Sequence, residues 1–545
     1  MSASAHVDTF ARDNLPSAAA QPAFVFDLPE LQYPQRLNAA VELLDRRVEE
    51  GNGNRPCIVT QAETLTYVQL QERVNRIANV LVRDLGLVPG NRVLLRSANN
   101  AMMVATYFAV LKAGGIVVAT MPLLRAKEIS YVVEKAKIAF ALCDARLSEE
   151  MEKTRPLAPE LKKLVYWGQG GLETLMAQPG YENFSACDTA ADDVCLIAFT
   201  SGTTGQPKGT MHFHRDLLAV CDSYGKYVLR ANADDRFIGS PPLAFTFGTG
   251  GLVLFPMRVG ASTVLLEKAT PDDLLAAIEQ HRATICFTAP TAYRAILAKL
   301  EGRDISSLRK CVSAGEALPK ATWEAWFAAT GIRILDGIGS TEMLHIFIGS
   351  PEEDLRPGAT GKPVPGYQAM VIDEHGNALP PNVPGRLVVR GPTGCRYLAD
   401  ERQGKYVESG WNITGDTYLC DQEGYFWYQA RSDDMIVSAG YNIAGPEVES
   451  VLLAHPAVAE CGVVGCPDAD RGQIVKAYVV LKPGHAGDTA MTKSLQDFVK
   501  TEVAPYKYPR AVEYVASLPK TDTGKLQRFR LREAAVASVS AKLAS

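Results

Sequence analysis

The stretch TSGTTGQPKG, from Thr200 to Gly209, constrains this chain more than any other. It follows Val194 to Phe199, an apolar run typical of a buried strand. Glycines allow sharp bends and a close approach to a ligand, while N–H groups, hydroxyls and one ammonium suit a polyphosphate. A polar turn between two elements is the alternative. We expect the phosphate contacts to come from Thr200, Ser201, Gly202, Thr203, Thr204, Gly205 and Lys208.

This loop is not a Walker A loop, although it uses the same chemistry. Five residues separate Gly202 from Lys208, and Pro207 stands where the Walker motif requires glycine. Gly209 stands where that motif requires serine or threonine. The pattern therefore predicts a phosphate-binding loop of a different class.

The composition is that of a large globular protein with two or more units. The chain has 545 residues, of which 47% are hydrophobic and 21% charged, and both fractions are ordinary. A net charge of −5 offers no basic surface, so we expect no nucleic-acid partner. The eleven cysteines contain no CxxC pair, which favours reduced thiols, a cytoplasmic location and no zinc site.

No leader or membrane segment is predicted. The first 27 residues lack a basic start followed by an apolar core. The most apolar stretch, Val104 to Leu124, contains Lys112 and the pair Gly114-Gly115. A buried helix, a glycine turn and a buried strand explain it better than a membrane span.

Strand-like and helix-like segments alternate along the first part of the chain. Asn91 to Leu95, Gly115 to Ala119 and Ile138 to Cys143 have the composition of buried strands, with helix-length segments between them. This alternation predicts an α/β fold with doubly wound parallel sheets. We expect a helix from His212 to Val228. Short alternating strands with prolines, from Gly361 to Arg390, predict a small antiparallel β subdomain.

The C-terminal part reads as a separate α+β unit. A helix is expected to begin near Pro446-Glu447, and strands are expected at Ala457 to Val464 and Ile474 to Leu481, with a helix from Met491 to Val503. The unit has a plausible size for a small domain. We therefore predict an N-terminal domain of residues 1–432 and a C-terminal domain of residues 433–545.

Two segments after the loop contain side chains that could contact a ligand or a metal ion. SPPLAFTFGTGG, from Ser240 to Gly251, places aromatic rings on a loop, where they cap a core or face a ligand. GIRILDGIGSTEMLHIFIG, from Gly331 to Gly349, places Glu342 after a glycine-rich turn. A carboxylate beside a phosphate loop suits Mg²⁺. The alternative for Glu342 is the first turn of a helix capped by Ser or Thr.

Two later motifs complete the set. In WNITGD, Asp416 follows a glycine turn and can accept hydrogen bonds from both ribose hydroxyls, and Arg431 can add a charged donor. In LPKTDTGKLQR, Lys525 lies in a glycine-containing loop near the end of the chain. Each motif alone is weak, since a threonine-glycine-aspartate turn and a solvated lysine are both common.

Taken together and in this order, the motifs resemble those of the adenylate-forming enzymes: acyl- and aryl-CoA synthetases, peptide-synthetase adenylation domains and firefly luciferases. The resemblance spans nearly the whole chain. GIGSTEMLHIF is similar to the benzoate–CoA ligase branch in particular, because most synthetases carry an aromatic residue where Ile338 stands. Ala430 departs from the family, which usually has glycine there.

The resemblance implies ATP, Mg²⁺ and coenzyme A as ligands, and a mobile C-terminal domain that rotates about Asp433. It assigns catalysis to Lys525, Lys208, Glu342 and His345, and the metal to Glu342 and Thr204. Besides the phosphate loop, it assigns the nucleotide and coenzyme A to Ala314, Gly315, Glu316, Asp336, Gly337, Ile338, Gly339, Ser340, Thr341, Asp416, Tyr428, Arg431, Gly440 and Lys525.

The resemblance also implies a small aromatic carboxylic acid as substrate. Its pocket is assigned to Phe245, Thr246, Phe247, Phe255, Ala314, Gly339, His345 and Ile346. A hydroxyl at Thr246 can pair with a ring substituent, which favours 2-aminobenzoate, or with its own backbone. Benzoate, a hydroxybenzoate and loading of a carrier protein stay open, as does a homodimer. A non-catalytic relative would be expected to lack Lys525 or Glu342, and no sequence feature requires luciferase-like oxygen chemistry.

Overall fold

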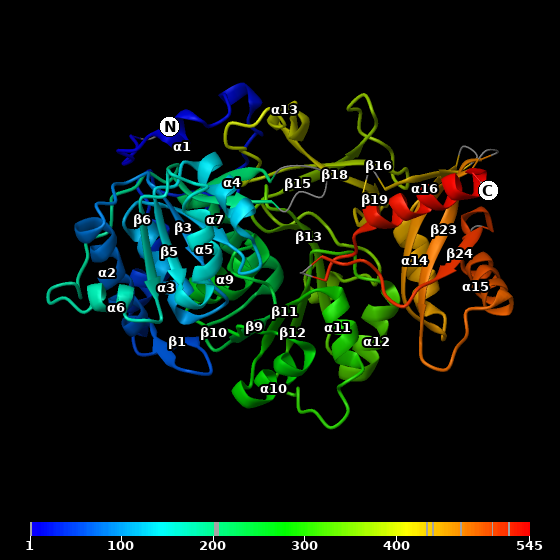
Figure 1. Ribbon diagram of the computed structural model, residues 1–545, viewed down its shortest axis with the longest axis horizontal. Coiled ribbons are helices and arrows are strands. Elements are labelled where there is room, and N and C mark those ends of the chain that lie inside the picture. Colours follow the sequence, from blue (N-terminus) through cyan, green and yellow to red (C-terminus); the bar gives the residue numbers. More distant parts are fainter. Residues whose placement is uncertain are drawn as a thin grey trace.

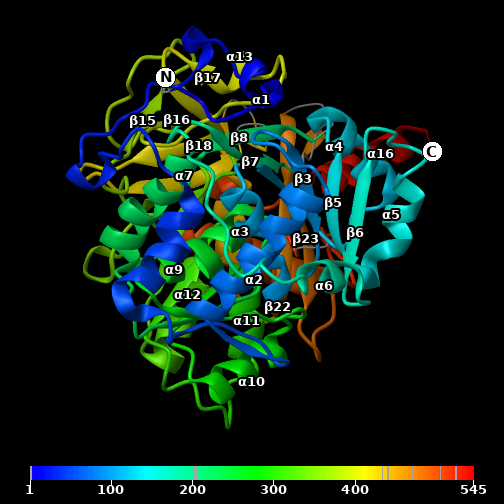
Figure 2. The same ribbon diagram turned by 90° about the vertical axis from the view of Figure 1, so that its left-hand side faces the viewer.

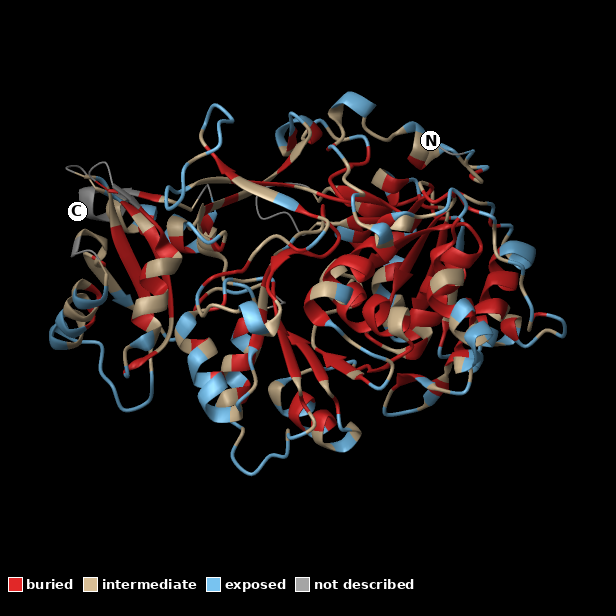
Figure 3. Cartoon of the chain, turned by 180° about the vertical axis from the view of Figure 1, so that it is seen from behind, coloured by how far each residue is buried: buried red, intermediate tan, exposed pale blue. Residues whose placement is uncertain are grey.

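The computed structural model describes residues 3–200, 207–431, 434–438, 441–468, 471–503, 505–521 and 524–544. Within these residues the strands form four sheets. Figure 1 shows two of them in the large blue-to-green part of the molecule, and the orange and red C-terminal elements at the opposite end from the N-terminus. The buried residues concentrate in the strands and the inner faces of the helices (Figure 3).

The first sheet has six strands in the order β6-β5-β3-β4-β7-β8. All neighbours are parallel except β7 and β8, and Figure 2 shows β3, β5 and β6 side by side. Its strands are β3 (Arg92–Arg96), β4 (Ile116–Thr120), β5 (Phe140–Asp144), β6 (Lys163–Trp167), β7 (Val194–Phe199) and β8 (Gly209–Phe213). The helices between them are α3 (Ala101–Lys112), α4 (Ala126–Ala136), α5 (Ser148–Thr154) and α6 (Gly171–Met176).

The second sheet has eight strands in the order β14-β13-β12-β11-β9-β10-β1-β2. Its interior is parallel, and an antiparallel strand closes each edge. The strands are β1 (Pro56–Val59), β2 (Thr64–Thr66), β9 (Arg236–Gly239), β10 (Ser262–Val264), β11 (Ile285–Thr288), β12 (Lys310–Ser313), β13 (Ile334–Gly339) and β14 (Ile346–Gly349).

Two of the remaining helices of this part, α2 and α10, begin at a threonine that caps the first turn. At the start of α2, for example, the Thr66 hydroxyl accepts a hydrogen bond from Gln69 N–H, and the Gln69 side chain accepts one from Thr66 N–H. The remaining helices are α1 (Phe10–Asp13), α2 (Tyr67–Asn79), α7 (His214–Val220), α8 (Thr246–Thr249), α9 (Phe255–Val259), α10 (Pro271–His281), α11 (Pro290–Leu297) and α12 (Lys320–Thr330). Segments with π-helical hydrogen bonding are Val41–Asp45, Val48–Asn52, Val80–Asp84, Cys221–Leu229 and Gly250–Leu254.

The predicted antiparallel β subdomain is confirmed. Its strands are β15 (Gln368–Ile372), β16 (Gly385–Arg390), β17 (Val407–Glu408), β18 (Trp411–Cys420) and β19 (Phe426–Arg431), with α13 (Gln403–Tyr406) between two of them.

The fourth sheet has its own hydrophobic core. Its strands are β20 (Ile436–Ser438), β21 (Tyr441–Ile443), β22 (Val458–Asp468), β23 (Gly472–Leu481) and β24 (Ala511–Tyr514), and its helices are α14 (Gly445–Ala454), α15 (Thr489–Glu502) and α16 (Arg528–Ala544). The chain thus changes sheet between Arg431 and Ile436. The boundary that we place at Asp433 lies outside the described residues and stays a prediction.

One local prediction is wrong, at the start of the helix expected from His212, and one open alternative is excluded. His212 belongs to strand β8 and not to a helix, because the phosphate loop is the tip of an antiparallel β7–β8 hairpin. Residues 340–345 form turns and no helix, so the helix-capping alternative for Glu342 is excluded, and β13 continues to Gly339.

The apolar stretch around Lys112 forms α3 and β4 as predicted. Among the described residues, no helix is long and apolar enough to cross a membrane. All eleven cysteines are free thiols, and nine of them are buried.

Candidate active site

The phosphate loop leaves β7 and returns to β8, and two hydrogen bonds, one between backbone groups and one from a backbone N–H to a side chain, close its base. Thr200 N–H donates to the Lys208 carbonyl at 3.0 Å, and Lys208 N–H donates to the Thr200 hydroxyl at 3.3 Å. The loop residues between them, with Ser201, Gly202, Thr203, Thr204 and Gly205, lie outside the described residues. The hairpin therefore fixes both ends of the predicted phosphate site.

The Lys208 ammonium lies in a cage of two tyrosine rings and one carboxylate. Its Nζ donates to the Tyr397 hydroxyl at 2.7 Å and lies 4.6 and 4.4 Å from the ring centroids of Tyr397 and Tyr406. Glu342 Oε1 is 3.7 Å away. Burial lowers the pKa of Lys208, and the charge of Glu342 opposes that effect. The cage holds a cation at the mouth of the loop.

Glu342 is the one described residue of the predicted metal pair. Its carboxylate is buried and accepts a hydrogen bond from the Tyr397 hydroxyl. No cluster of three or more His, Cys, Asp or Glu exists in the described part of the chain. Because Mg²⁺ that travels with a nucleotide needs only one or two carboxylates beside phosphate oxygens, Glu342 fits that kind of site but not a metal cage built by protein alone.

A buried anchor fixes the turn that carries Glu342. The carbonyl of Thr341 lies 2.9 Å from His212 Nε2, whose Nδ1 is 3.6 Å from Asp216 Oδ2. That carboxylate also binds Arg396 Nη1 at 2.7 Å, and all three side chains are fully buried. Although burial opposes it, Arg396 lowers the pKa of Asp216. The anchor ties strand β8, the turn at Thr341 and the segment before Tyr397 together.

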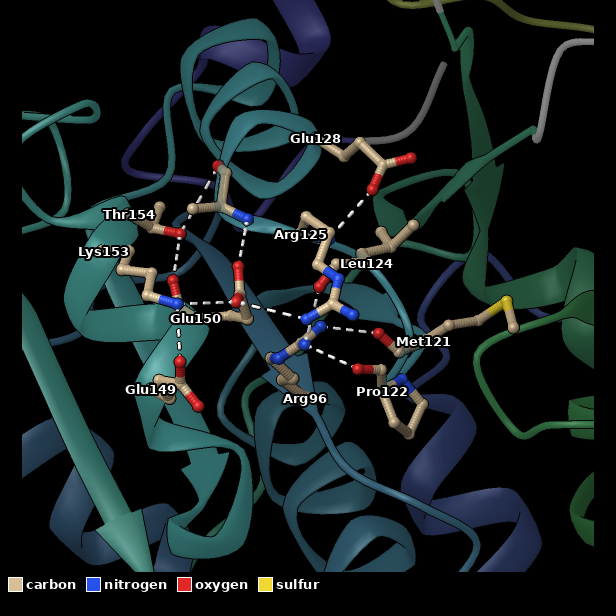
Figure 4. A network of polar contacts seen from close by, with 11 residues as sticks. Arg96, Met121, Pro122, Leu124, Arg125, Glu128, Glu149, Glu150, Lys153 and Thr154 are labelled. Atoms are coloured by element: carbon tan, nitrogen blue, oxygen red, sulfur yellow. Dashed lines mark hydrogen bonds and ion pairs between the residues drawn. The ribbon is translucent and has the colours of Figure 1, made fainter. Parts of the chain in front are cut away.

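A second clamp holds the loop that follows β4, the neighbour of β7 (Figure 4). Arg96, which is 1% exposed, donates from its guanidinium to the carbonyls of Met121, Pro122 and Leu124 at 2.6 to 2.8 Å. Glu150 accepts from Ala126 N–H at 2.8 Å at the start of α4. Since β4 and β7 are parallel neighbours, this loop leaves the sheet at the same edge as Thr200, the described residue at the start of the phosphate loop.

The predicted ribose residues are cross-strand partners. Asp416 on β18 is in register with Arg431 on β19, and Arg431 Nη1 lies 3.3 Å from Asp416 Oδ1. Burial, together with the charge of Asp416, raises the pKa of Tyr428. These three residues therefore lie close together on the paired strands β18 and β19.

Lys525 reaches from the C-terminal part to the loop after β12. A Cβ placed on Gly315, whose φ is +91°, would lie 3.6 Å from Lys525 Nζ. The lysine keeps solvent contact, yet desolvation lowers its pKa and Glu316 opposes this change. Lys525 N–H donates to the Thr521 hydroxyl at 3.0 Å. Lys525 and the strip Ala314, Gly315 and Glu316 are thus brought together.

The strip predicted to face the adenine comprises the second part of β13 and the turn that follows it. Gly337 and Gly339 pack so closely on β14 and His345 that a Cβ on either would lie within 2.7 Å of a neighbouring atom. Burial raises the pKa of Asp336 to about 8. Ile338 is partly buried against the main core, and the Ser340 hydroxyl accepts from Met343 N–H at 3.2 Å. Glycine is therefore required by space here and not by backbone conformation.

Aromatic rings surround His345 on several sides. Its ring centroid lies 4.6 Å from that of Phe255, 5.6 Å from Phe247 and Tyr224, and 6.4 Å from Phe287. We call these five residues the ring cage. Neither His345 nitrogen has a hydrogen-bond partner among the described residues, and burial lowers its pKa to about 3. The imidazole is therefore neutral at pH 7.

Other predicted substrate residues lie around this cage or apart from it. Ala314 and Ile346 are buried in the same core cluster as Phe255, and Gly339 touches the His345 carbonyl. Thr246 opens helix α8 and is half-buried. Phe245 is half-buried and has no ring contact with the cage in the described structure. Gly440 and Asp433 lie outside the described residues.

Sequence reasoning missed four residues that the structure places at the site. Tyr397 and Tyr406 contact Lys208, while Tyr224 and Phe287 belong to the ring cage. No local pattern marks them, because each reaches the site from a helix, strand or loop distant in sequence. Tyr397 directly follows Arg396, and its place at the site becomes apparent only from the fold, in which Arg396 is buried against Asp216.

The chain matches known proteins along most of its length. Residues 44–397 match the AMP-binding enzyme family, and residues 447–525 match the AMP-binding enzyme C-terminal domain. A benzoate–CoA ligase of Thauera aromatica is 38% identical over 516 residues, which are 93% of this chain and 98% of the relative.

Two solved structures are similar throughout. The anthranilate CoA ligase AuaEII, solved with anthranoyl-AMP, has a TM-score of 0.90 and 37% identity, over 94% of this chain and 100% of that one. A benzoate CoA ligase from Burkholderia xenovorans LB400 has a TM-score of 0.82 and 32% identity, over 91% of this chain and 100% of that one. This chain belongs to the AMP-binding enzyme family, in the branch of the benzoate–CoA ligases.

Proposed function

We propose that the acid activated by this AMP-forming aryl–CoA ligase is 2-aminobenzoate, with ATP and coenzyme A as co-substrates. A free carboxylate is a poor acyl donor, because its leaving group would be oxide. The carboxylate oxygen therefore attacks the α-phosphorus of ATP, and the bond to pyrophosphate breaks. The thiol of coenzyme A then attacks the acyl carbon of the aryl-adenylate, and AMP leaves.

One observation carries this proposal: Gly315, which lies beside the Lys525 ammonium, directly follows a residue of the core cluster to which two rings of the cage belong. Ala314 belongs to the buried cluster that contains Phe255 and Phe287, and the next residue, Gly315, lies against Lys525. A ring held in the cage would thus present its carboxylate toward a cation. The neutral His345 would orient that carboxylate by a hydrogen bond and not by charge.

Charge stabilisation would supply most of the rate enhancement in the first step. Negative charge develops around the α-phosphate, and fixed cations lower the energy of that state. Lys525 and the caged Lys208 are the protein's cations here. Glu342, with the Thr204 hydroxyl, would hold Mg²⁺, which offsets phosphate charge when it is bound. Asp416 and Arg431 would hold the ribose.

The second step requires room for the pantetheine arm. We propose that the C-terminal domain turns about Asp433 after adenylation and withdraws Lys525, bringing Gly440 to the site. The contact between Lys525 and Gly315 supports the view that the present arrangement is the one for adenylation. The C-terminal part has a small hydrophobic core of its own, and such a separate core would allow it to move as a unit.

The amino-substituted acid is supported by the similarity to AuaEII, and plain benzoate is the second candidate. Benzoate is favoured by the similarity to the Thauera relative and by the largely apolar lining of the ring cage.

A panel of benzoate, 2-aminobenzoate and 2-hydroxybenzoate, supplied with ATP, Mg²⁺ and coenzyme A alone, distinguishes the candidate substrates. We expect AMP and thioester formation with the highest kcat/KM for 2-aminobenzoate. A higher value for benzoate would reverse the order, and aryl-adenylate without thioester would point to a carrier protein as acceptor.

A further inference from the structure

Tyr224 lies in the ring cage on the π-helical segment Cys221–Leu229. Its ring centroid is 5.6 Å from that of His345 and 5.7 Å from that of Phe255. A Cβ placed on Gly349 would lie 3.5 Å from Tyr224 Cε2, so strand β14 packs against the ring edge. π-Helical turns are rare and occur often at functional sites.

The hydroxyl of Tyr224 is buried and has no hydrogen-bond partner among the described residues. The whole side chain is 0% exposed. Most buried polar groups in native structures are paired, because an unpaired one destabilises the fold. Phenylalanine would fill the same space without that cost, and what sets the Tyr224 hydroxyl apart from other unpaired groups is its place in the ring cage.

The electrostatic surroundings keep the Tyr224 phenol protonated. Burial raises its pKa, and the nearby carboxylate of Asp336 adds to this effect. A protonated phenol can both donate and accept a hydrogen bond. It can accept from an amino group, and it can donate to or accept from a hydroxyl group.

We propose that the Tyr224 hydroxyl is a specificity-determining group that pairs with the amino or hydroxyl substituent on the ring of the aryl acid. This inference rests on the proposed function, because it assigns a role within the same pocket. Tyr224 would then share this role with Thr246, the residue that the sequence suggests for it. The two come from different elements, Tyr224 from a π-helical segment after α7 and Thr246 from α8.

The chemical consequence is discrimination against the unsubstituted ring. Benzoate would leave the hydroxyl buried and unpaired, whereas 2-aminobenzoate would satisfy it. A site built to hydrogen-bond a substrate group rejects the analogue that lacks this group, because the site's own polar atom is then left without a partner. A cage of apolar rings alone would hold both acids about equally.

Tyr224→Phe removes only the hydroxyl and tests the proposal. We expect kcat/KM for 2-aminobenzoate to fall about three- to tenfold, which is the range of one neutral hydrogen bond, while the value for benzoate stays constant or rises. Calorimetric titration of each acid into the full chain gives the same comparison without turnover. Tyr107→Phe is the matched control, since Tyr107 on α3 is also buried with an unpartnered hydroxyl but is not in the ring cage. Its substrate ranking should equal that of the wild type.

Two results would overturn the inference. One is an equal change for both acids in Tyr224→Phe, which would mean that the hydroxyl serves packing or an internal water. The other is a shift of the same size in Tyr107→Phe. Thermal unfolding of both variants shows whether a uniform loss comes from instability. If the wild type forms no thioester with any acid, the proposed function fails; if it does and the ranking survives in Tyr224→Phe, only this inference fails.

Discussion

Lys208 and Glu342 carry opposite charges 3.7 Å apart, and the hydroxyl of Tyr397 contacts both of them. The tyrosine donates to the carboxylate and accepts from the ammonium, so it orients two groups that we propose to act on the nucleotide. Removing it would leave each group with one partner fewer in a buried place, where charged groups depend strongly on their hydrogen bonds.

Tyr397→Phe should therefore impair the first half-reaction. Hydrogen bonds to charged groups contribute about 1.5–3 kcal/mol, so we expect kcat/KM for ATP to fall roughly ten- to a hundredfold. Pyrophosphate release measures this step. Tyr406→Phe is the control, because Tyr406 contacts Lys208 through its ring alone and the ring remains. Equal effects of the two changes would show that the Tyr397 hydroxyl has no special role.

Lys525→Ala should separate the two half-reactions. The activation free energy of adenylate formation should rise by about 2–4 kcal/mol or more, because one fixed cation is lost at the phosphoryl group. Thioester formation from a supplied aryl-adenylate should be spared. Lys520→Ala serves as the control, since Lys520 pairs with Glu460 at 2.8 Å. Equal damage to both steps in Lys525→Ala would contradict the two-conformation mechanism.

Asp336 predicts a pH dependence of stability. Burial raises its pKa in the folded chain to about 8, whereas an unfolded aspartate titrates at about 3.9. The folded state thus binds the proton more tightly. Its contribution to stability is full below pH 3.9 and is lost as the pH rises to 8. Asparagine does not titrate, so Asp336→Asn avoids this loss. The melting temperature of the variant minus that of the wild type should therefore be higher at pH 9 than at pH 5. A difference that does not change with pH would contradict the shifted pKa.

Thr246→Ala tests the residue that the sequence suggested. If its hydroxyl meets the ring substituent, the loss of kcat/KM should be several-fold for 2-aminobenzoate and small for benzoate, as expected for about 0.5–1.5 kcal/mol. Phe255→Ala should instead depress every acid together, because it removes packing that all benzoates share. A uniform loss in Thr246→Ala would assign the hydroxyl to the backbone.

The predictions from sequence succeeded where chemistry dictates a local pattern. A parallel sheet needs apolar runs at regular intervals, so the α/β class could be predicted, and it is confirmed. Phosphate binding needs glycines and hydroxyls within one loop, so the sequence also predicts the phosphate loop, and that assignment stays a prediction. The assignment of a helix at His212 failed because β8 is buried on both faces. A strand of that kind shows no alternation of apolar and polar residues to distinguish it from a buried helix.

The ring cage and the Lys208 cage could not be predicted in full for another reason. Their members come from elements that meet only after folding: Tyr224 follows α7, Phe287 lies on β11, and Tyr397 precedes α13. Tyrosine and phenylalanine are also ordinary core residues, so their composition gives no signal. Only the folded structure distinguishes Tyr224, whose hydroxyl lacks a partner among the described residues, from Tyr293, whose hydroxyl donates to two backbone carbonyls.

Because most of its thiols are buried, cysteine labelling can report local unfolding of this chain. Of the eleven cysteines, only Cys187 and Cys420 are half-buried, and the other nine are buried. Alkylation depends on access and on the thiolate form, and burial raises the pKa of Cys395 beside Tyr397. A reagent applied to the native protein should thus mark Cys187 and Cys420 first. The order in which the others become labelled, read by peptide mass, would show which sheet separates from its neighbours first.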